Sequence, residues 1–302
     1  MLQLKAIAIT CLISFNAYAG LYGLDSANPL TKEELNQTSL FRKTSILNYP
    51  QEMRNNIITL SQYGKKNNPD FQIVIHEGQE LAKTSTFEKG VSGFEKAIKK
   101  EYDQNFLAKE DNMPNFEKEY LSYIDGVVKN KIYFKDKKLK FLKNSNHKLI
   151  SKFSDIENYW FDLSDDDYKD KSEKIKKIIN SNFDIIIINP MFKNKEKYTE
   201  DEINSMKFKK SGAPRLILAQ MNLSEISPKD YRYKQEWNKQ KPKWFARISL
   251  VNEKDYITKY WTSEWKKLLS RHFKAIVESG YNGAFLTGAD NHKYFEKTNP
   301  IY

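Results

Sequence analysis

Hydrophobic positions in the second half of the chain alternate between two patterns. Short apolar runs that are typical of buried strands lie at residues 158–163, 185–189, 214–221 and 283–287. Between these runs, apolar residues recur at helical spacing over 167–180 and 262–279, and the capping box Thr199-Glu-Asp-Glu202 predicts the start of another helix. Gly280 directly follows the 262–279 pattern and marks a helix C-terminus. Strands that alternate with helices predict a parallel sheet of the α/β class.

The first half of the chain shows the same alternation less regularly. Apolar residues at helical spacing predict a helix that begins at Pro50 and stops before Pro69. A short buried strand is expected over 71–76 and another over 120–125. Between them, residues 81–119 are rich in lysine and glutamate, and we expect helices and loops there.

The first 19 residues have the features of a signal peptide. Lys5 is their only charge, an apolar run covers 6–15, and Ala17-Tyr-Ala19 has the small-x-small pattern that a signal peptidase cleaves. The apolar run is too short to cross a bilayer, and no later stretch approaches the roughly 20 residues that a transmembrane helix needs. We therefore expect a periplasmic or secreted protein with no transmembrane segment.

Composition narrows the class further. Cys11 is the one cysteine and lies inside the signal segment, so residues 20–302 hold no disulfide or cysteine metal site. The formal net charge of +11 suits an anionic partner, but the lysines are spread along the whole chain and form no nucleic-acid-binding motif. No linker divides residues 20–302, which we expect to form a single domain. The oligomeric state is unknown from the sequence.

In a parallel α/β sheet, ligand-binding groups gather just beyond the carboxyl ends of the strands. The polar residues expected at those ends are Asp162, Asn189, Asn222–Glu225, Thr287–Asp290, His76 and Asp125. Together they predict a ring of candidates for a polar site.

Several segments resemble one known family. Residues Ala219–Arg232, with Glu225 and the closing Asp230-Tyr-Arg232, are similar to the "YLSIGEAEDYR" signature of the endo-α-1,4-polygalactosaminidase-like glycoside hydrolases. In the same order, Thr258–Trp265 resembles the family's "VRYW…EW" and Gly280–Thr287 resembles its "GFDGVYLD". The resemblance implies an exported (β/α)8 TIM barrel that acts on an amino sugar polymer.

The N-terminal half resembles the family out of order. Residues 53–71, the strand to Gly78, and residues 120–126 are similar to segments that normally follow the "YLD" strand. New termini between the units of a closed ring are tolerated, because surface loops carry few contacts. We therefore expect a circularly permuted TIM barrel.

Acids of the family are missing at four matched positions, where this chain has Asn130, Asn189, Asn282 and Thr287. Glycoside hydrolysis requires two carboxyl groups, about 5 Å apart for retention or about 6.5–9.5 Å apart for inversion. An amide can hold a sugar hydroxyl but cannot transfer a proton. The leading hypothesis is therefore a glycoside-hydrolase-like protein that binds an amino sugar polymer or other glycan, with catalysis weakened or lost.

Two alternatives stay open. In the first, the protein is an active endo-glycosidase that uses Glu225 as its catalytic residue with a relocated carboxylate from Asp162, Asp230 or Asp290. In the second, it is a non-enzymatic envelope interaction protein that binds an anionic polymer through its basic surface.

The candidate substrate-binding residues are polar or aromatic residues near the strand ends: Asn189, Asp230, Arg232, Thr287, Asp290, His76, Trp160 and Trp261. Several have ordinary structural interpretations. Asp230 and Arg232 can form an ion pair that braces their loop, and at least one of Trp261 and Trp265, spaced at i and i+4, is expected in the core.

The sequence predicts neither a cofactor nor a metal. No phosphate loop, dinucleotide fingerprint or G-x-S-x-G elbow occurs, and the histidines have no metal-ligand spacing. We attribute the run Asp165-Asp-Asp167 to favourable negative charge at a helix N-terminus, since the later ligands of a calcium loop are absent.

Overall fold

The computed structural model describes residues 46–93, 116–129, 131–134, 137–138, 156–249 and 255–299. The chain divides into two compact units, and almost all of the described residues belong to the unit formed by Tyr49–Thr86 and Met113–Pro300. The signal segment, Asn130 and most of the 81–119 insert lie outside the described residues, so the expectation of a single domain over 20–302 stays a prediction.

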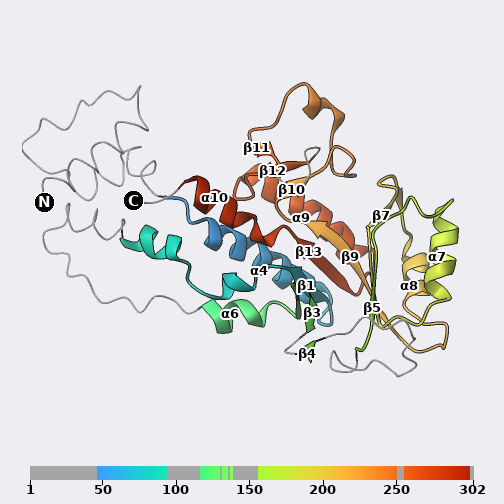
Figure 1. The fold of residues 1–302 in the computed structure, drawn as a ribbon. Helices are drawn as coiled ribbons and strands as arrows, with labels where there is room; N and C mark the ends of the chain where they lie inside the picture. Colours follow the sequence, from blue (N-terminus) through green and yellow to red (C-terminus); the bar gives the residue numbers. More distant parts are fainter. Residues whose placement is uncertain are drawn as a thin grey trace, which may run out of the picture. The chain divides into compact units, whose positions relative to one another are not determined.

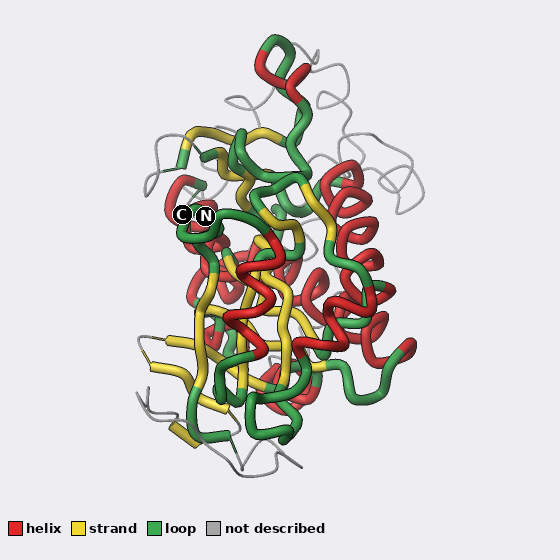
Figure 2. Tube along the Cα trace, turned by 90° about the vertical axis from the view of Figure 1, so that its right-hand side faces the viewer, coloured by secondary structure: helices red, strands yellow, loops and turns green. Residues whose placement is uncertain are grey.

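Six parallel strands form a curled half-barrel (Figures 1 and 2). In spatial order they are β5 (Tyr159–Asp162), β6 (Ile185–Ile188), β9 (Leu216–Asn222), β13 (Gly283–Thr287), β1 (Gln72–His76) and β2 (Gly126–Lys129). Two antiparallel strands, β3 (Lys131–Phe134) and β4 (Lys137–Lys138), extend the β2 edge. The α/β class is confirmed, whereas the described residues form a half-barrel and show no closed eight-stranded barrel.

The first described strand of the chain lies beside the last. β1 pairs in parallel with β13, with Ile73 opposite Ala284 and Ile75 opposite Leu286, and β2 continues the sheet on the other side of β1. The N-terminal strands therefore follow β13 in space although they precede it in sequence. A permuted chain would produce this order, but the permutation itself stays a prediction.

The helices that accompany the sheet are α4 (Tyr49–Asn67), α6 (Phe116–Ser122), α7 (Lys171–Ile179), α8 (Glu200–Met206), α9 (Ser263–Glu278) and α10 (His292–Thr298). The capping box at the start of α8 is confirmed, because the Thr199 side chain accepts from the Glu202 backbone and Glu202 bonds back to Thr199. Gly280 is confirmed as the residue that ends α9, with φ of +87°. No helix in the described part of the chain is long and apolar enough to cross a bilayer.

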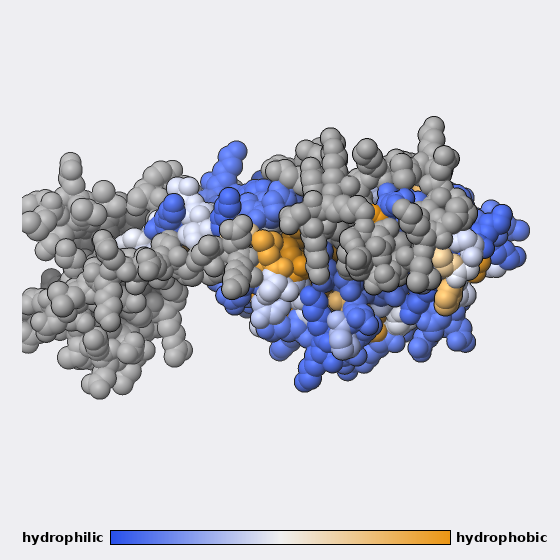
Figure 3. All heavy atoms as spheres, turned by 90° about the horizontal axis from the view of Figure 1, so that it is seen from below, coloured by the Kyte–Doolittle hydropathy of each residue, from blue (hydrophilic) through white to orange (hydrophobic). Residues whose placement is uncertain are grey.

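The core lies against the middle strands. All four residues of β6 are buried, as are the central residues of β1 and β13. Ile185, Leu218 and Phe285 belong to one packed cluster that spans neighbouring strands. Strands covered on both faces have no polar side to alternate with, which explains the continuous apolar runs in the sequence. On the face drawn in Figure 3, the described side chains are mainly hydrophilic.

The strand predicted over 120–125 is wrong. These residues contain the end of α6 and the turn before β2, and the buried residues Tyr120 and Ile124 are four apart, a helical rather than a strand spacing. Asp125 consequently precedes β2 and does not lie at a strand carboxyl end. Its carboxylate accepts from the Ile73 backbone N–H at 2.9 Å and contacts Lys65 at 3.2 Å, so it is removed from the predicted ring of site residues.

Smaller elements follow the carboxyl ends of the main strands. β10 (Glu225–Ile226), β12 (Tyr256–Thr258) and β11 (Phe245–Ile248) form an antiparallel three-stranded sheet, and β7 (Met191–Phe192) pairs with β8 (Glu196–Lys197). Among the described residues, the short 3-10 helices are η1 (Gln79–Ala82), η3 (Gln235–Asn238) and η4 (Ala289–Asn291). The three-stranded sheet begins at Glu225 and therefore contributes directly to the candidate site.

Candidate functional site

A tight corner between β9 and β10 positions Glu225. β9 ends at Asn222, whose side-chain oxygen accepts the backbone N–H groups of Ser224 at 3.0 Å and Glu225 at 2.8 Å. An asparagine side chain that bonds to the backbone two or three residues onward stabilises a turn. The Leu223 N–H donates to the Thr287 carbonyl at 2.9 Å, which ties the corner to the end of β13.

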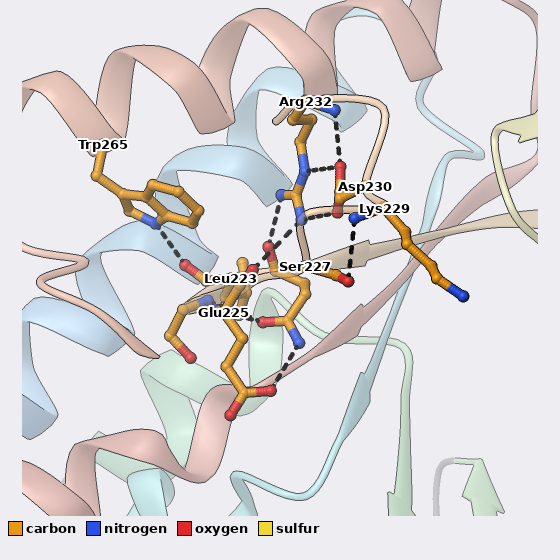
Figure 4. A network of polar contacts seen from close by, with 9 residues as sticks. Leu223, Glu225, Ser227, Lys229, Asp230, Arg232 and Trp265 are labelled. Carbon is orange, nitrogen blue, oxygen red and sulfur yellow. Dashed lines mark hydrogen bonds and ion pairs between the residues drawn. The ribbon is translucent and has the colours of Figure 1, made fainter. Parts of the chain in front are cut away.

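The Glu225 carboxylate is held by neutral groups. One oxygen accepts from the Ser249 hydroxyl at 3.2 Å, and the other from the Asn222 amide at 3.4 Å. The side chain is half-buried. Figure 4 shows it extending from the corner in a direction away from the Asp230–Arg232 pair. A carboxylate whose partners are neutral hydrogen-bond donors has lone pairs left for a ligand.

Asp230 and Arg232 form a bidentate ion pair that braces the loop after β10, which confirms the structural interpretation (Figure 4). Arg232 Nε lies 2.9 Å from one Asp230 oxygen and Nη2 lies 2.7 Å from the other. Its Nη1 donates to the Asn222 carbonyl at 2.8 Å. Burial alone would raise the pKa of Asp230, but the charge and hydrogen bonds of Arg232 outweigh it and leave that pKa below its ordinary value. This acid is therefore held as a charged partner of arginine and is unsuited to proton transfer.

The loop after β13 closes against the same corner. Ser224 Oγ donates to the Gly288 carbonyl at 2.6 Å and accepts from the Asn291 amide at 2.8 Å. Gly288 has φ of +76°, and a Cβ there would lie 2.5 Å from the Asn222 side-chain oxygen. Asp290 belongs to this loop, and among the described residues it forms no ion pair with lysine or arginine.

The Thr287 hydroxyl, at the end of β13, is buried and has no hydrogen-bond partner within the described part of the chain. Buried polar atoms are ordinarily paired. The strand end where the family resemblance implies an acid therefore offers a hydroxyl that bonds to no described group.

The tryptophans divide into core and partly exposed residues. Trp265 is 0% exposed, and its indole N–H donates to the Leu223 carbonyl at 2.7 Å (Figure 4). This confirms that at least one of Trp261 and Trp265 packs in the core. Trp261 is half-buried, with its ring 4.7 Å from Phe295 and 5.1 Å from Tyr49. These ring contacts favour a packing role for Trp261 over a role as a platform for a sugar ring.

A second polar group lies at the end of β5. Lys174 is 0% exposed, and its ammonium lies 2.6 Å from Asp165 and 3.9 Å from the Asp162 carboxylate, which also accepts from the Tyr168 hydroxyl at 2.8 Å. Burial raises the pKa of Asp162, and Lys174 opposes that effect. Attributing Asp165 to the charge of a helix N-terminus is wrong: α7 begins at Lys171 with Asp170 as its cap, whereas Asp165 lies earlier and pairs with the buried lysine.

Other predicted residues lie on separate strands. The Asn189 amide donates to the Leu163 carbonyl at 2.7 Å. His76 ends β1, with its ring 6.2 Å from Phe285. Trp160, in β5, packs 5.5 Å from Phe183. None of the three has a hydrogen bond or ring contact with the Glu225 corner in the described part of the chain, so the structure does not join them to it.

Two amides and a hydroxyl acquire roles that the sequence did not indicate. Asn282 precedes β13, and its side-chain oxygen accepts from the Ile217 N–H at 2.9 Å, so it joins two strands at their amino ends. Ser249 and Asn291 complete the Glu225 corner from segments 24 and 67 residues away from their partners. No local signal marks either residue, because both are placed by tertiary packing.

Sequence comparison finds distant relatives. No protein-family profile matches the chain. A protein of Methanocaldococcus jannaschii described as uncharacterized protein MJ1477 is 32% identical over 130 residues, which cover 42% of this chain and 36% of that protein. An uncharacterized protein of Thermotoga maritima is 24% identical over 126 residues, covering 41% of this chain and 38% of that protein. The matches thus span well under half of these curated relatives.

Among solved structures, the glycoside hydrolase domain of PelA from Pseudomonas aeruginosa superposes with a TM-score of 0.30 at 11% identity, covering 46% of this chain and 49% of that chain. A variant of the same domain gives a TM-score of 0.29. This likeness is distant. The resemblance to the polygalactosaminidase-like family stays an expectation from the sequence motifs.

Proposed function

We propose that this chain is an exported glycan-binding protein with a permuted, glycoside-hydrolase-like barrel in which catalysis is weakened or lost. Glu225 is the residue that binds the glycan, accepting hydrogen bonds from sugar hydroxyls at the carboxyl end of β9. Asn222 and Ser249 hold its carboxylate in place.

The observation that carries the proposal is the contrast between Glu225 and two other acids, Asp230 in the same sequence motif and Asp162 at the end of β5, two strands away from β9. Glu225 has neutral partners, whereas Asp230 is paired with Arg232 and Asp162 lies beside buried Lys174. Hydrolysis requires a second carboxyl group that can transfer a proton or attack the sugar. An acid that is already bonded to a cation serves poorly in either role, so the arrangement favours binding over bond cleavage.

The test is binding of the purified protein to an array of neutral, amino sugar and acidic glycans, compared with Glu225→Gln. The variant keeps the side-chain volume and removes the charge and one acceptor. We expect loss of about tenfold or more in affinity, because hydrogen bonds to a charged group contribute about 1.5–3 kcal/mol. Glu236→Gln is the matched control, since Glu236 is exposed in η3 and has one long ion pair with Lys234 at 3.7 Å. Absence of binding to every glycan contradicts the proposal.

One observation favours an active enzyme as the second candidate. Asp290 lies in the loop whose Asn291 bonds to the Glu225 corner through Ser224, and among the described residues no lysine or arginine forms an ion pair with it. It is therefore a candidate for the second acid that would act with Glu225. Release of reducing ends from a glycan, abolished by both Glu225→Gln and Asp290→Asn, would establish hydrolysis. Binding without release would leave the non-catalytic function.

A further inference from the structure

We infer that the glycan bound at Glu225 carries an acidic substituent and that Arg247 binds it. This inference, which rests on the proposed glycan-binding function, concerns an exposed guanidinium in β11. It specifies the class of glycan that the site would select.

Arg247 and Glu225 lie on the same face of the three-stranded sheet. Glu225 pairs with Ile257 across β10 and β12. Arg247 pairs with the same Ile257 across β11 and β12, after a shift in register between Phe245 and Arg247. Residues that are directly opposite on neighbouring antiparallel strands project to one face. Ile257 is 3% exposed, so the two charged side chains flank a buried position. Ser249, two residues after Arg247, reaches Glu225 from the same side.

The guanidinium of Arg247 is oriented by an aromatic ring. Its central carbon lies 5.2 Å from the ring centroid of Tyr294, and its Nε donates to the Ile248 carbonyl at 2.9 Å. Tyr294 is in α10, one turn after Asn291, whose amide bonds to Ser224 beside Glu225. Two separate segments therefore place Arg247 near the Glu225 corner. One is β11, which leads to Ser249, and the other is α10, which follows Asn291 and carries Tyr294.

Within the described part of the chain, no group bonds to the outer edge of this guanidinium. Arg247 is exposed, and its two terminal nitrogens have no hydrogen-bond or ion-pair partner among the residues that the structure describes. The two terminal nitrogens of a guanidinium form a planar fork, and their N–H groups match the two oxygens of an oxyanion. Neutral sugar hydroxyls would gain little from this arrangement. A carboxylate or sulfate substituent fits it, and both present the same paired oxygens.

The opposite face of the same sheet provides a matched control. Lys241 places its ammonium 4.7 Å from the ring centroid of Tyr256. Tyr256 pairs with Ile226 and Ile248, so it projects away from the face that carries Glu225 and Arg247. Lys241→Gln therefore removes the same formal charge from an exposed cation–aromatic pair, on the side that the inference leaves unused.

The experiment compares binding of uronate oligosaccharides, sulfated galactan oligosaccharides and neutral galactan oligosaccharides of equal length. We expect the wild-type protein to prefer an acidic class and Arg247→Gln to lower that affinity about tenfold or more while leaving neutral binding unchanged. Arg247→Lys should retain part of the preference, because the charge remains without the fork. Lys241→Gln should leave both affinities within about twofold, as expected for a charge that contacts no ligand.

The outcomes separate the inference from the proposed function. Preference for the uronate or for the sulfated series supports the inference and identifies the substituent. Equal affinity for neutral and acidic glycans, or an equal loss for both in Arg247→Gln, overturns the inference and leaves glycan binding intact. No binding to any of the three classes overturns the inference, and the proposed function then falls only if the amino sugar glycans of the array also fail to bind. Unchanged melting temperatures would show that the variants are folded.

Discussion

Replacing Arg232 with methionine tests whether the Asp230–Arg232 pair holds the loop beside Glu225. Arg232 is 4% exposed, forms two bonds with Asp230 and donates to the Asn222 carbonyl. The change leaves a carboxylate without its cation in a site that is largely closed to water. Removing one partner of a buried ion pair costs about 3–5 kcal/mol, and Arg232→Met should lower the free energy of unfolding by that amount at pH 7.

The loss should depend on pH in a defined direction. The pKa of Asp230 is lowered in the folded state, so its contribution to stability is present above the unfolded pKa of about 3.9 and declines as pH falls through the lower folded value. The difference between wild type and Arg232→Met should therefore shrink in acid. Urea unfolding between pH 7 and pH 3, followed by tryptophan fluorescence, measures it.

A double-mutant cycle completes the test. Asp230→Asn with Arg232→Met removes the uncompensated charge, and we expect it to recover part of the stability that Arg232→Met loses. A loss below about 1 kcal/mol for Arg232→Met, a size typical of exposed pairs, would refute the argument that this pair is buried and structural. A loss that does not change with pH would refute the role of Asp230.

The remaining predictions concern other parts of the unit. Gly288→Ala should destabilise the protein by more than Gly212→Ala, because both glycines have positive φ but only the Cβ at Gly288 would meet other atoms. Left-handed strain alone costs about 1–2 kcal/mol in either variant. Equal melting temperatures for the two variants would contradict the expected steric clash at Gly288. Lys209→Met should lower the free energy of unfolding by about 3–5 kcal/mol, since it removes the ammonium that lies 2.5 Å from the Asp184 carboxylate, which is 0% exposed. Urea titration measures this loss, and an unchanged stability would show that the pair is dispensable. Burial, reinforced by a nearby arginine, lowers the pKa of His272 to about 4. The folded state therefore binds fewer protons than the unfolded state between about pH 6.5 and 4, and the free energy of unfolding decreases as the pH is lowered through that window. His272→Phe should flatten that part of the profile, and an unchanged slope would show that other groups cause it.

Much of the fold could be predicted from local patterns. The uninterrupted isoleucines of 185–188 are typical of a strand buried on both faces, and the structure places β6 between β5 and β9. The Thr199 capping box and Gly280 act within one helical turn, so their consequences are visible in sequence. The prediction over 120–125 failed because a short apolar run fits either a strand or a helix end.

The candidate site likewise combines a local contact that the sequence predicts with long-range contacts that it does not. Asp230 and Arg232 are two residues apart, and their pairing was predicted and is confirmed. The partners of Glu225 were not, since Ser249 approaches from the end of β11 across a sheet whose register no local pattern specifies. The same holds for Arg247, whose orientation depends on Tyr294 in a helix 47 residues further along the chain.

The order of residues was enough to specify most of the strands and helices, because hydrophobic period and capping chemistry act over a few residues. Which acids remain available was settled by tertiary packing. Asp162 is committed to Lys174 and Asp184 to Lys209, whereas Glu225 keeps neutral partners. A carboxylate's state depends on the charges and dipoles that packing brings within a few ångströms, and spacing along the chain does not determine those distances.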